Sequence, residues 1–546
     1  MKANHPIDAK DTVMSSGSRA VCWMTAAWAT LLAVVCIRNN HRFLYDDVFI
    51  TLRYALHLVE GHGPIWNLNE APVEGFTSPL HLLLVAALGK VGLPLVYAAR
   101  AVGFGSHLLL VVFLWRFVAR SDGAVSGTLV AALVATSWPM LVWDLGGLDA
   151  VLFAAILTAG TLVTLRNIET GRRSDLLCGG ALFGFAVFAR PDGALVAAVA
   201  ILACVILGKS PIRERLAHAC LAAAICALVV LPWEMFRLAY YHSLLPNTYY
   251  AKVHGVALGF RVMSGIQYWR IYARNAPYLA FMVFVVAIAA IAKRRVTRFD
   301  LGLGTCLVAY AIYVVNSGGD HMVAFRFMVP MVPLLAVALV RGIRALGGLE
   351  TTYAAVAVTV VLSLVSARQI VPSVENPLVR DTAGLIGEQI GRYINAHWAQ
   401  GSVVGTNVAG TAYFADQLIF IDMLGLNDSV IANEAPANLD LPTNKMIGHL
   451  KADGAYVLAR RPEYIILAGG NTLGQKKGVP GYLISDYELL NSPEFADNYR
   501  NCELDLPISD DVNRQLPPDV FRPAPKQLGF VYYQRRDLRG SCTAPR

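Results

Sequence analysis

Two adjacent carboxylates, Asp46 and Asp47, follow the first long hydrophobic segment of the chain. One of them has an ordinary explanation, because Asp is a preferred N-cap residue and an amphipathic stripe runs from Val48 to Gly61. The second carboxylate needs a partner, a metal ion or a role in a reaction. We therefore predict that at least one of the pair is catalytic. Glu74, farther along the same loop, is the next acidic candidate, with simple surface exposure as its alternative.

The composition indicates that these carboxylates lie beside a membrane. Of the 546 residues, 56% are hydrophobic and only 15% are charged, whereas about a quarter of residues are charged in ordinary globular domains. Eleven apolar runs approach the length that crosses about 30 Å of hydrocarbon. They are residues 20–37, 101–118, 124–142, 150–165, 176–189, 194–207, 216–231, 276–292, 301–315, 327–340 and 352–365. The first run lacks a convincing cleavage site, so we expect a retained helix rather than a signal peptide.

Basic residues predict the orientation, because positively charged loops stay in the cytoplasm. They fall in alternate loops, with clusters at 116–120, 166–173, 209–215, 293–298 and 341–344. Residues 1–19 then form a cytoplasmic tail, and residues 20–368 form the multi-span domain. The scheme requires residues 79–90 to be a re-entrant or juxtamembrane helix rather than a further span.

This orientation places nearly all short polar motifs on the outer face. They are "YDDVF" in the first outer loop (residues 38–78), "WDLGGLD", "ARPDG", "PNTYYAKVHG" and "NSGGDHMVAFRF". Charged groups at membrane depth are costly and usually face a partner or a wet cavity. The pattern therefore predicts one extracytoplasmic site.

The chain changes character in its last third, where hydrophobic runs shorten and prolines and charges increase. The stretch "GSVVGTNVAGTAYFADQLIFIDMLGLND" predicts strand, helix and strand, and "PEYIILAG" and "GFVYYQRR" predict further strands. We expect an extracytoplasmic α/β domain over residues 369–546. An oxidising compartment would allow a disulfide between Cys502 and Cys542, but the sequence does not establish that they are close.

These motifs together resemble the GT-C glycosyltransferases, which use polyprenyl-phosphate sugars. The segments "YDDVFITLRYALHLVEGHGPIWN", "VEGFTSPL", "ARPDG", "PNTYYAK", "GGDHMVAFRFMVPMVPLL" and "IDMLGLND" are most similar to the branch of terminal β-(1→2)-arabinofuranosyltransferases and pilin arabinofuranosyltransferases. The resemblance implies an all-α polytopic membrane domain of about eleven transmembrane helices. It implies transfer of a sugar, arabinofuranose above all, to a glycan, lipid or pilin-like protein acceptor. It also implies a bacterial inner-membrane protein with an extracytoplasmic active site.

The candidate residues can be assigned roles from their chemistry. Asp46 or Asp47 would deprotonate the acceptor hydroxyl; net retention of configuration would instead allow a carboxylate to act as nucleophile. Outer-face cations would stabilise the leaving phosphate: Arg190, Lys252, His321 and Arg326. The candidates for substrate binding are Glu74, Asp192, Asn247, Tyr249, Asp320, Asp422 and Asn427.

Each of these residues also has a structural alternative. Arg190 and Asp192 form a simple ion pair, Lys252 extends to the membrane surface, His321 is structural, and Tyr249 belongs to the interfacial aromatic belt. Turn chemistry would explain Asn247, Asp422 and Asn427.

A divalent cation is an open question at this stage. Oxygen atoms of Asp46, Asp47 and Asp320, together with a substrate phosphate, would suit Mg²⁺, Mn²⁺ or Ca²⁺, whereas zinc is not expected because no Cys/His cluster occurs. The net charge of +8 is concentrated in the predicted inner loops and does not indicate nucleic-acid binding.

The rival function is a transporter or flippase for a lipid-linked sugar. Transporters commonly contain internal repeats and charges near the membrane midplane. This chain shows no convincing repeat, and its charged motifs gather at one face. The pattern favours an enzyme that works at the interface over a transporter or a scaffold protein.

Overall fold

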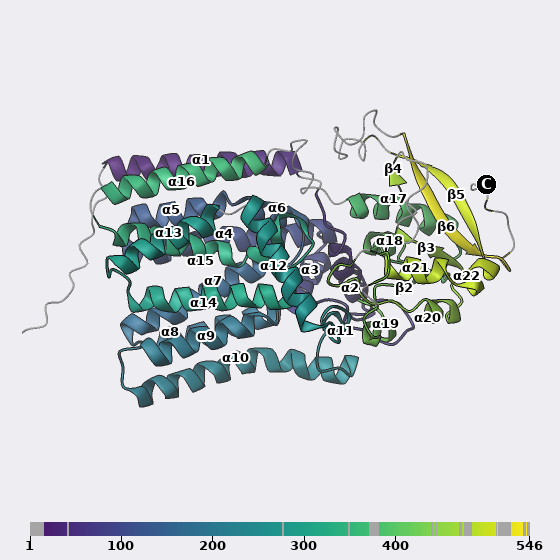
Figure 1. Cartoon of the computed structure of the whole chain (residues 1–546), viewed down its shortest axis with the longest axis horizontal. Helices are drawn as coiled ribbons and strands as arrows, with labels where there is room; N and C mark the ends of the chain where they lie inside the picture. The colour runs from purple at the N-terminus through teal and green to yellow at the C-terminus, as the bar shows by residue number, and fades with distance from the viewer. Residues whose placement is uncertain are drawn as a thin grey trace, which may run out of the picture.

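The protein consists of a long helical bundle with an α/β domain at one end (Figure 1). The computed structural model describes residues 16–40, 43–275, 278–347, 350–370, 382–437, 440–443, 445–468, 472–473, 483–508, 510, 526–538 and 542. Of the predicted N-terminal tail, residues 1–15 lie outside the described residues, and residues 16–19 already belong to helix α1.

All the predicted apolar runs overlap helices of the bundle. These are α1 (Ser16–Asn40), α4 (Leu95–Asp122), α5 (Ala124–Ala135), α6 (Trp138–Gly146), α7 (Ala150–Thr170), α8 (Arg173–Ala189), α9 (Gly193–Leu207), α10 (Ile212–Tyr241), α13 (Tyr278–Ala292), α14 (Arg298–Ser317), α15 (Met331–Ala345) and α16 (Glu350–Ile370). The run at 124–142 is broken into α5 and α6, which meet at 52°. Helix α12 (Leu258–Asn275) was not predicted.

The length and apolar composition of its helices indicate that the chain is a multi-pass membrane protein. Within the described residues, four helices are long and apolar enough to cross a membrane, or up to six if each bent pair counts as one span. The number of eleven spans stays a prediction.

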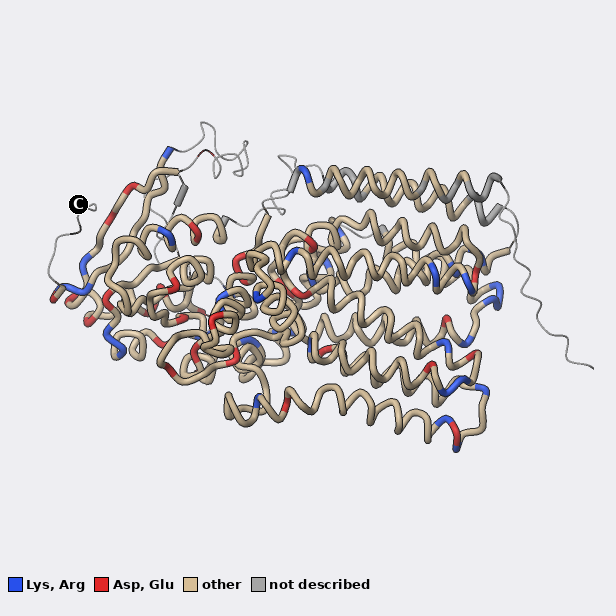
Figure 2. Tube along the Cα trace, turned by 180° about the vertical axis from the view of Figure 1, so that it is seen from behind, with Lys and Arg blue, Asp and Glu red and all other residues tan. Residues whose placement is uncertain are grey.

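Lys and Arg residues gather at the end of the bundle far from the α/β domain, which we call the basic end (Figure 2). Arg341 illustrates their environment there, since it donates to Asp122 at 2.7 Å and to Asp300 at 2.9 Å. The alternate basic loops of the sequence thus meet on one side of the bundle, as the positive-loop pattern predicts.

Short helices fill the opposite end of the bundle, which we call the domain end. They are α2 (Val48–Glu60), α3 (Pro79–Lys90), α11 (Asn247–Lys252) and the 3-10 helix η1 (Val323–Met328). Gly61 ends α2 with φ of 91°, a conformation that favours glycine. Helix α3 has the bounds expected of the re-entrant or juxtamembrane helix, and its 12 residues are too few to cross a bilayer.

The C-terminal domain contains a six-stranded mixed sheet of order β2-β1-β3-β6-β4, with β5 also paired to β6. Its strands are β1 (Val403–Thr406), β2 (Ile419–Asp422), β3 (Tyr464–Ile466), β4 (Thr472–Leu473), β5 (Tyr499–Pro507) and β6 (Gln527–Arg535). Its helices are α17 (Thr382–His397), α18 (Ala409–Phe414), α19 (Ser429–Asn433), α20 (Gly454–Ala459), α21 (Ile484–Leu490) and α22 (Pro493–Asn498). The predicted strand, helix and strand are confirmed as β1, α18 and β2, and the strands in "PEYIILAG" and "GFVYYQRR" are β3 and β6.

The sheet contains two strands, β4 and β5, that were not predicted from the sequence. β1 runs parallel to β2 and β3, whereas β6 is antiparallel to β3, β4 and β5. Strand β5 contains charged residues on its exposed face, so its apolar signal is weak. Cys502 on β5 forms a disulfide with Cys542, with Cα atoms 5.3 Å apart.

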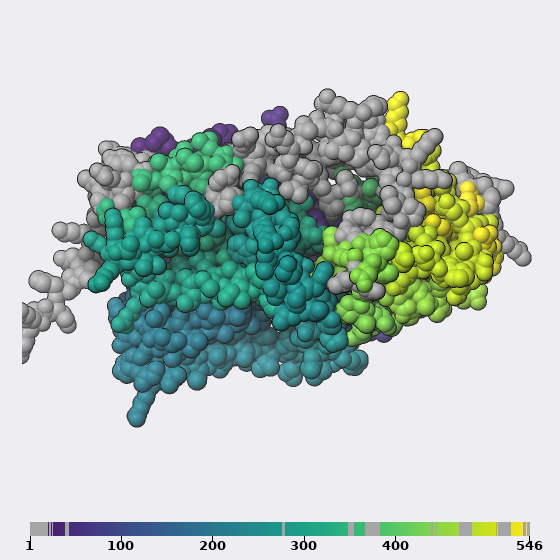
Figure 3. Space-filling model, viewed as in Figure 1, coloured from purple at the N-terminus to yellow at the C-terminus, as the bar shows by residue number. Residues whose placement is uncertain are grey.

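The first outer loop joins the two parts of the molecule. The buried Arg53 of α2 donates to the carbonyl oxygens of Trp66 (2.8 Å), Ala412 and Leu418 (3.0 Å). The Asn67 side chain pairs with both backbone groups of Phe420, at 3.0 and 2.8 Å, and so extends the edge strand β2. In the space-filling view the lime and yellow C-terminal domain lies directly against the domain end of the bundle (Figure 3).

Candidate active site

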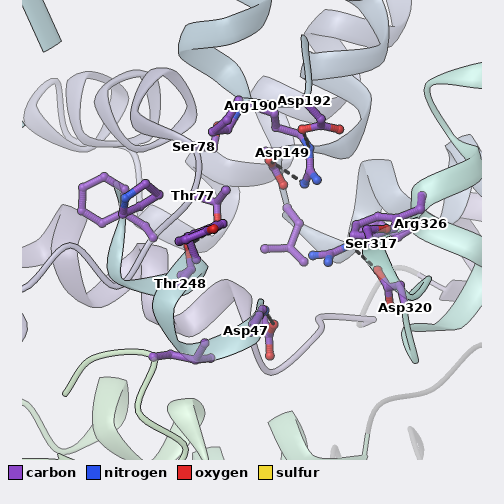
Figure 4. Close-up of a pocket in the computed structure, with 18 of the residues that line it drawn as sticks. Asp47, Thr77, Ser78, Asp149, Arg190, Asp192, Thr248, Ser317, Asp320 and Arg326 are labelled. Atoms are coloured by element: carbon purple, nitrogen blue, oxygen red, sulfur yellow. Dashed lines mark hydrogen bonds and ion pairs between the residues drawn. The ribbon is translucent and has the colours of Figure 1, made fainter. Parts of the chain in front are cut away.

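A cavity of about 250 Å³ lies at the domain end, beneath the C-terminal domain. Its wall is built from the first outer loop, the loops before α7 and α9, the α11 segment and the loop between α14 and η1. Its charged lining residues are Asp47, Asp149, Arg190, Asp192, Lys252, Asp320 and Arg326, most of which are labelled in Figure 4. Motifs that are more than 270 residues apart in sequence, from Asp47 to Arg326, therefore form one site.

Asp47 is the carboxylate of the pair that faces this cavity. It occupies the N-cap position of α2, but its side chain makes no capping hydrogen bond. The nearest cation is Lys252, with Nζ 4.0 Å from Oδ2, and the two side chains are 30% and 26% exposed for Lys252 and Asp47 respectively. Burial lowers the pKa of Lys252, and the charge of Asp47 partly offsets that effect. Asp47 is thus accessible to a ligand and not committed to the helix.

Asp46 faces the C-terminal domain instead. Its Oδ2 and Oδ1 atoms accept hydrogen bonds from the backbone amides of Ala409 (3.0 Å) and Gly410 (2.8 Å) at the start of α18. It does not line the main cavity and meets Asp47 only in a small adjoining pocket of about 30 Å³. Adjacent in sequence, the two carboxylates have different partners.

Arg190 lies between two carboxylates on the wall opposite Asp47 (Figure 4). It donates to Asp192 at 2.9 Å and to Asp149 at 3.4 Å. The guanidinium also stacks over Phe153 and Phe327, with its central carbon 5.5 and 5.3 Å from the ring centroids. The predicted ion pair with Asp192 is confirmed, and both partners still line the cavity.

A second ion pair joins Arg326 to Asp320 at 2.8 Å. Burial opposes ionisation of Asp320, but Arg326 together with the other nearby cations and the Met322 amide outweighs burial and lowers the pKa of that carboxyl. His321 lies beside them in ring contact with His449 of the C-terminal domain, at a centroid distance of 4.9 Å. Burial lowers the pKa of His321 despite the neighbouring Asp320, so His321 is poorly suited to hold a positive charge near neutral pH.

Glu74 and Asn247 lie next to the cavity without lining it. Glu74 is 2% exposed and accepts hydrogen bonds from Trp233 (3.0 Å) and Arg237 of α10. The alternative of surface exposure for Glu74 is wrong. The Asn247 side chain donates to the backbone oxygens of Gly425 (2.8 Å) and Leu426 (2.9 Å), so it ties α11 to the C-terminal domain.

Asp422 and Asn427 stabilise the loop after β2. Asp422 accepts hydrogen bonds from the Leu424 amide at 3.0 Å and from both the amide and the side chain of Asn427, at 2.8 and 2.7 Å. Burial raises the pKa of Asp422 to about 6. Both residues line the small pocket that Asp46 and Asp47 share, while Tyr249 lines the main cavity and is 39% exposed.

The sequence analysis did not single out several polar residues of the cavity. Asp149 ends the quoted "WDLGGLD" motif, and Thr77 lies in the turn that precedes α3; both could have been named from those motifs. The Thr77 and Thr248 hydroxyls lie 3.1 Å apart (Figure 4). The buried His81 also lines the cavity, and its Nε2 atom has no hydrogen-bond partner within the described structure. The sequence could not have indicated His81 as a cavity residue, because it stands alone in an apolar helix outside any polar motif.

The described residues contain no group of three or more His, Cys, Asp or Glu side chains suited to a metal ion. Both oxygens of Asp46 are engaged by backbone amides, and Lys252 is the nearest charge to Asp47. The carboxylate pair therefore does not fit a divalent cation well, and the question of a bound cation, which the sequence leaves open, is still untested.

Known proteins share this architecture. The solved ArnT of Cupriavidus metallidurans matches 74% of this chain and 86% of its own with a TM-score of 0.52 at 13% identity, and its complex with undecaprenyl phosphate matches with 0.51 at 14% identity. The oligosaccharyltransferase of Archaeoglobus fulgidus matches 81% of this chain and 67% of its own, with a TM-score of 0.51 and 12% identity. A family model described as dolichyl-phosphate-mannose-protein mannosyltransferase matches residues 78–236. The chain therefore shares the fold of ArnT and of the oligosaccharyltransferase.

Two further matches concern the sequence. The terminal β-(1→2)-arabinofuranosyltransferase of Mycobacterium tuberculosis is 27% identical over 377 residues, which are 57% of this chain. The aligned part is 54% of that relative, so this chain spans about half its length. Residues 376–511 match a domain of unknown function, DUF8728, which coincides with most of the C-terminal domain.

Proposed function

We propose that this protein is a GT-C glycosyltransferase, which transfers a sugar from a polyprenyl-phosphate donor to a hydroxyl group of an acceptor. The observation that carries the proposal is the cavity at the domain end, where Asp47 and three cations line one space in a chain with the fold of ArnT. The ArnT complex with undecaprenyl phosphate supports a lipid phosphate as the donor group.

The side chains of the cavity divide the reaction between them. Asp47 takes the proton from the acceptor hydroxyl, the acceptor oxygen forms the new bond to the anomeric carbon, and the bond from that carbon to the phosphate oxygen breaks. The phosphate leaves with the bonding electrons. Its charge is stabilised by nearby cations, of which Lys252 is the least neutralised, since Arg190 and Arg326 are already paired with carboxylates.

The identities of the donated sugar and of the acceptor are more specific parts of the proposal. We propose arabinofuranose on the similarity to the mycobacterial enzyme, and a cell-envelope glycan, lipid or pilin-like protein as the acceptor. The membrane would be the bacterial inner membrane, with the cavity and the C-terminal domain on the extracytoplasmic side. The gathering of Lys and Arg at the basic end supports this orientation.

The decisive experiment supplies the purified full chain with a panel of polyprenyl-phosphate pentoses and hexoses and identifies which donor is consumed. We expect polyprenyl phosphate to be released together with a glycosidic product. Asp47→Asn is the matched inactive control. Movement of intact lipid-linked sugar across liposomes without a glycosidic product would replace the proposal with the flippase alternative.

Two simpler experiments test the orientation and the metal. The orientation is tested in intact cells with a membrane-impermeant maleimide that has been shown to reach the inner membrane. The reagent should label a cysteine that replaces the exposed Ser429, but not a cysteine that replaces the exposed Arg294. The opposite labelling pattern would mean that the orientation is reversed.

Since Asp46 is engaged by α18, we expect transfer to persist after exhaustive chelation. If chelation abolishes transfer and Mg²⁺, Mn²⁺ or Ca²⁺ restores it, the reaction requires a divalent cation.

A further inference from the structure

A second cavity lies at the basic end, at the opposite end of the bundle from the candidate active site. It is a groove of about 500 Å³ between α4, α7, α14 and α15. Its charged lining residues are Arg116, Arg120, Arg166, Arg341 and Glu169. Arg166 is paired with Asp175, and Arg341 with Asp122 and Asp300, so the positive charge that is not balanced at the mouth of the groove comes from Arg116 and Arg120.

The wall of this groove is apolar and opens on the side of α4. Its apolar lining residues are Leu109, Val112, Phe113, Phe117, Val163 and Phe299. Leu109 is 71% exposed and Val112 is 39% exposed, on a helix long and apolar enough to span the membrane. The groove thus combines a basic mouth with an apolar channel on a surface that faces lipid.

Two of the arginines are held in place by the fold. Arg341 is fixed by Asp122 and Asp300, at 2.7 and 2.9 Å, and stacks over Phe299 at 4.6 Å. Arg166 stacks over Phe117 at 5.8 Å. These contacts orient the two guanidinium groups before any ligand arrives, which lowers the entropy cost of binding.

The other two arginines carry charge that no carboxylate balances. Arg116 and Arg120 lie one helical turn apart on the same face of α4, and both are exposed. Neither forms a hydrogen bond or an ion pair within the part of the chain that the structure describes. Positive residues that only fix membrane topology need water around them, and they do not need an apolar groove beside them.

We propose that this groove is a binding site for an anionic glycerophospholipid. The arginines hold the phosphate headgroup, to which guanidinium groups donate paired hydrogen bonds, and the acyl chain lies along the apolar wall of α4 and α7. The site is separate from the donor cavity and does not depend on the proposed transferase activity.

The test measures lipid binding to the delipidated full chain in detergent, by native mass spectrometry and by lipid-dependent thermal stabilisation. Dioleoylphosphatidylglycerol should bind, and dioleoylphosphatidylcholine should not compete with it. Arg116→Gln combined with Arg120→Gln should weaken binding about 25-fold, because each arginine near an anionic headgroup contributes roughly fivefold. The matched control is Arg294→Gln with Arg295→Gln, which removes the same charge at the basic end outside the groove and should bind normally.

A second variant separates the groove from its charge. Val112→Trp places a large side chain in the groove and keeps all the arginines. It should weaken phosphatidylglycerol binding by about tenfold or more, because the added volume occupies the space of the acyl chain. Normal binding by this variant would overturn the proposal. Equal loss in the two arginine pairs, or full competition by millimolar inorganic phosphate, would overturn it as well.

Discussion

The two ends of the helical bundle place charged side chains in different environments. At the domain end, Arg190 and Arg326 are paired with carboxylates around a cavity. At the basic end, Arg116 and Arg294 are exposed, although Asp175 is buried beside Arg166. Burying a charge is costly unless it is paired, whereas exposed arginines cost little and can orient the chain. Charged pairs that line a cavity, rather than charged residues in general, are therefore the candidates for a reactive site.

The largest expected effect separates the two adjacent carboxylates. Asp47→Asn should lower the transfer rate by about 10² to 10⁴, the range for loss of a general base, in a kinetic assay at matched protein level. Asp46→Asn should change the rate far less, because an amide oxygen still caps α18. A larger loss in the Asp46 variant would move the reacting carboxylate into the small adjoining pocket.

The next effect concerns the joint between bundle and C-terminal domain. Arg53→Met leaves the buried carbonyls of Trp66 and Leu418 without donors, which should destabilise the protein by about 3 kcal/mol. Thermal unfolding in detergent measures the loss, and Arg294→Met at the exposed basic end should show little change. Equal melting of the two variants would mean that the joint contributes no stability.

Lys252 offers the cleanest comparison between cations of the two ends. Lys252→Gln should weaken donor use by roughly 10-fold to 100-fold, from the loss of a charge-assisted hydrogen bond of about 1.5–3 kcal/mol. Arg344→Gln at the basic end is the control. Alanine at Arg190 or Arg326 is less informative, since it leaves a buried carboxylate unpaired. If Lys252→Gln and Arg344→Gln lower donor use equally, the donor phosphate does not bind near Lys252.

The smallest expected effect, counted per pH unit, is a pH dependence at the domain end. Burial lowers the pKa of His449 from 6.5 to about 3. The unfolded chain therefore binds a proton first as the pH falls, so the free energy of unfolding should decrease between pH 6.5 and 3 by at most about 1.4 kcal/mol per pH unit. His449→Gln should flatten this dependence, whereas replacing the exposed His397 with Gln should not. Parallel curves for the two variants would contradict the assignment.

Much of the fold could be predicted because its signals are local. Apolar runs placed the long helices, and alternating apolar residues placed β6. Helix α12 was missed because its sequence mixes charged and apolar residues. Close packing places it, since Gly265 lies against the backbone of Val315 on α14, where an added Cβ would be 2.2 Å from the carbonyl oxygen. Such contacts have no signature within the helix itself.

The candidate site could be predicted only as a set of residues. Motif positions correctly brought Asp47, Arg190, Lys252 and Arg326 to one cavity. The same reasoning could not separate Glu74, which pairs with Arg237 of a distant helix, from the residues that face the cavity. Pairing depends on the position of the partner, and the sequence gives no distance between elements.

The sequence by itself determined which segments form long apolar helices, which loops carry positive charge and that β1, β2, β3 and β6 are strands, because hydrophobicity, charge and side-chain period act over a few residues. Only the tertiary structure decided that Asp46 holds the C-terminal domain while Asp47 faces the cavity, and that Cys502 meets Cys542. The physical reason is that consecutive side chains point in different directions, and their partners lie hundreds of residues away. Long-range packing therefore decides which of two identical neighbours is free to react.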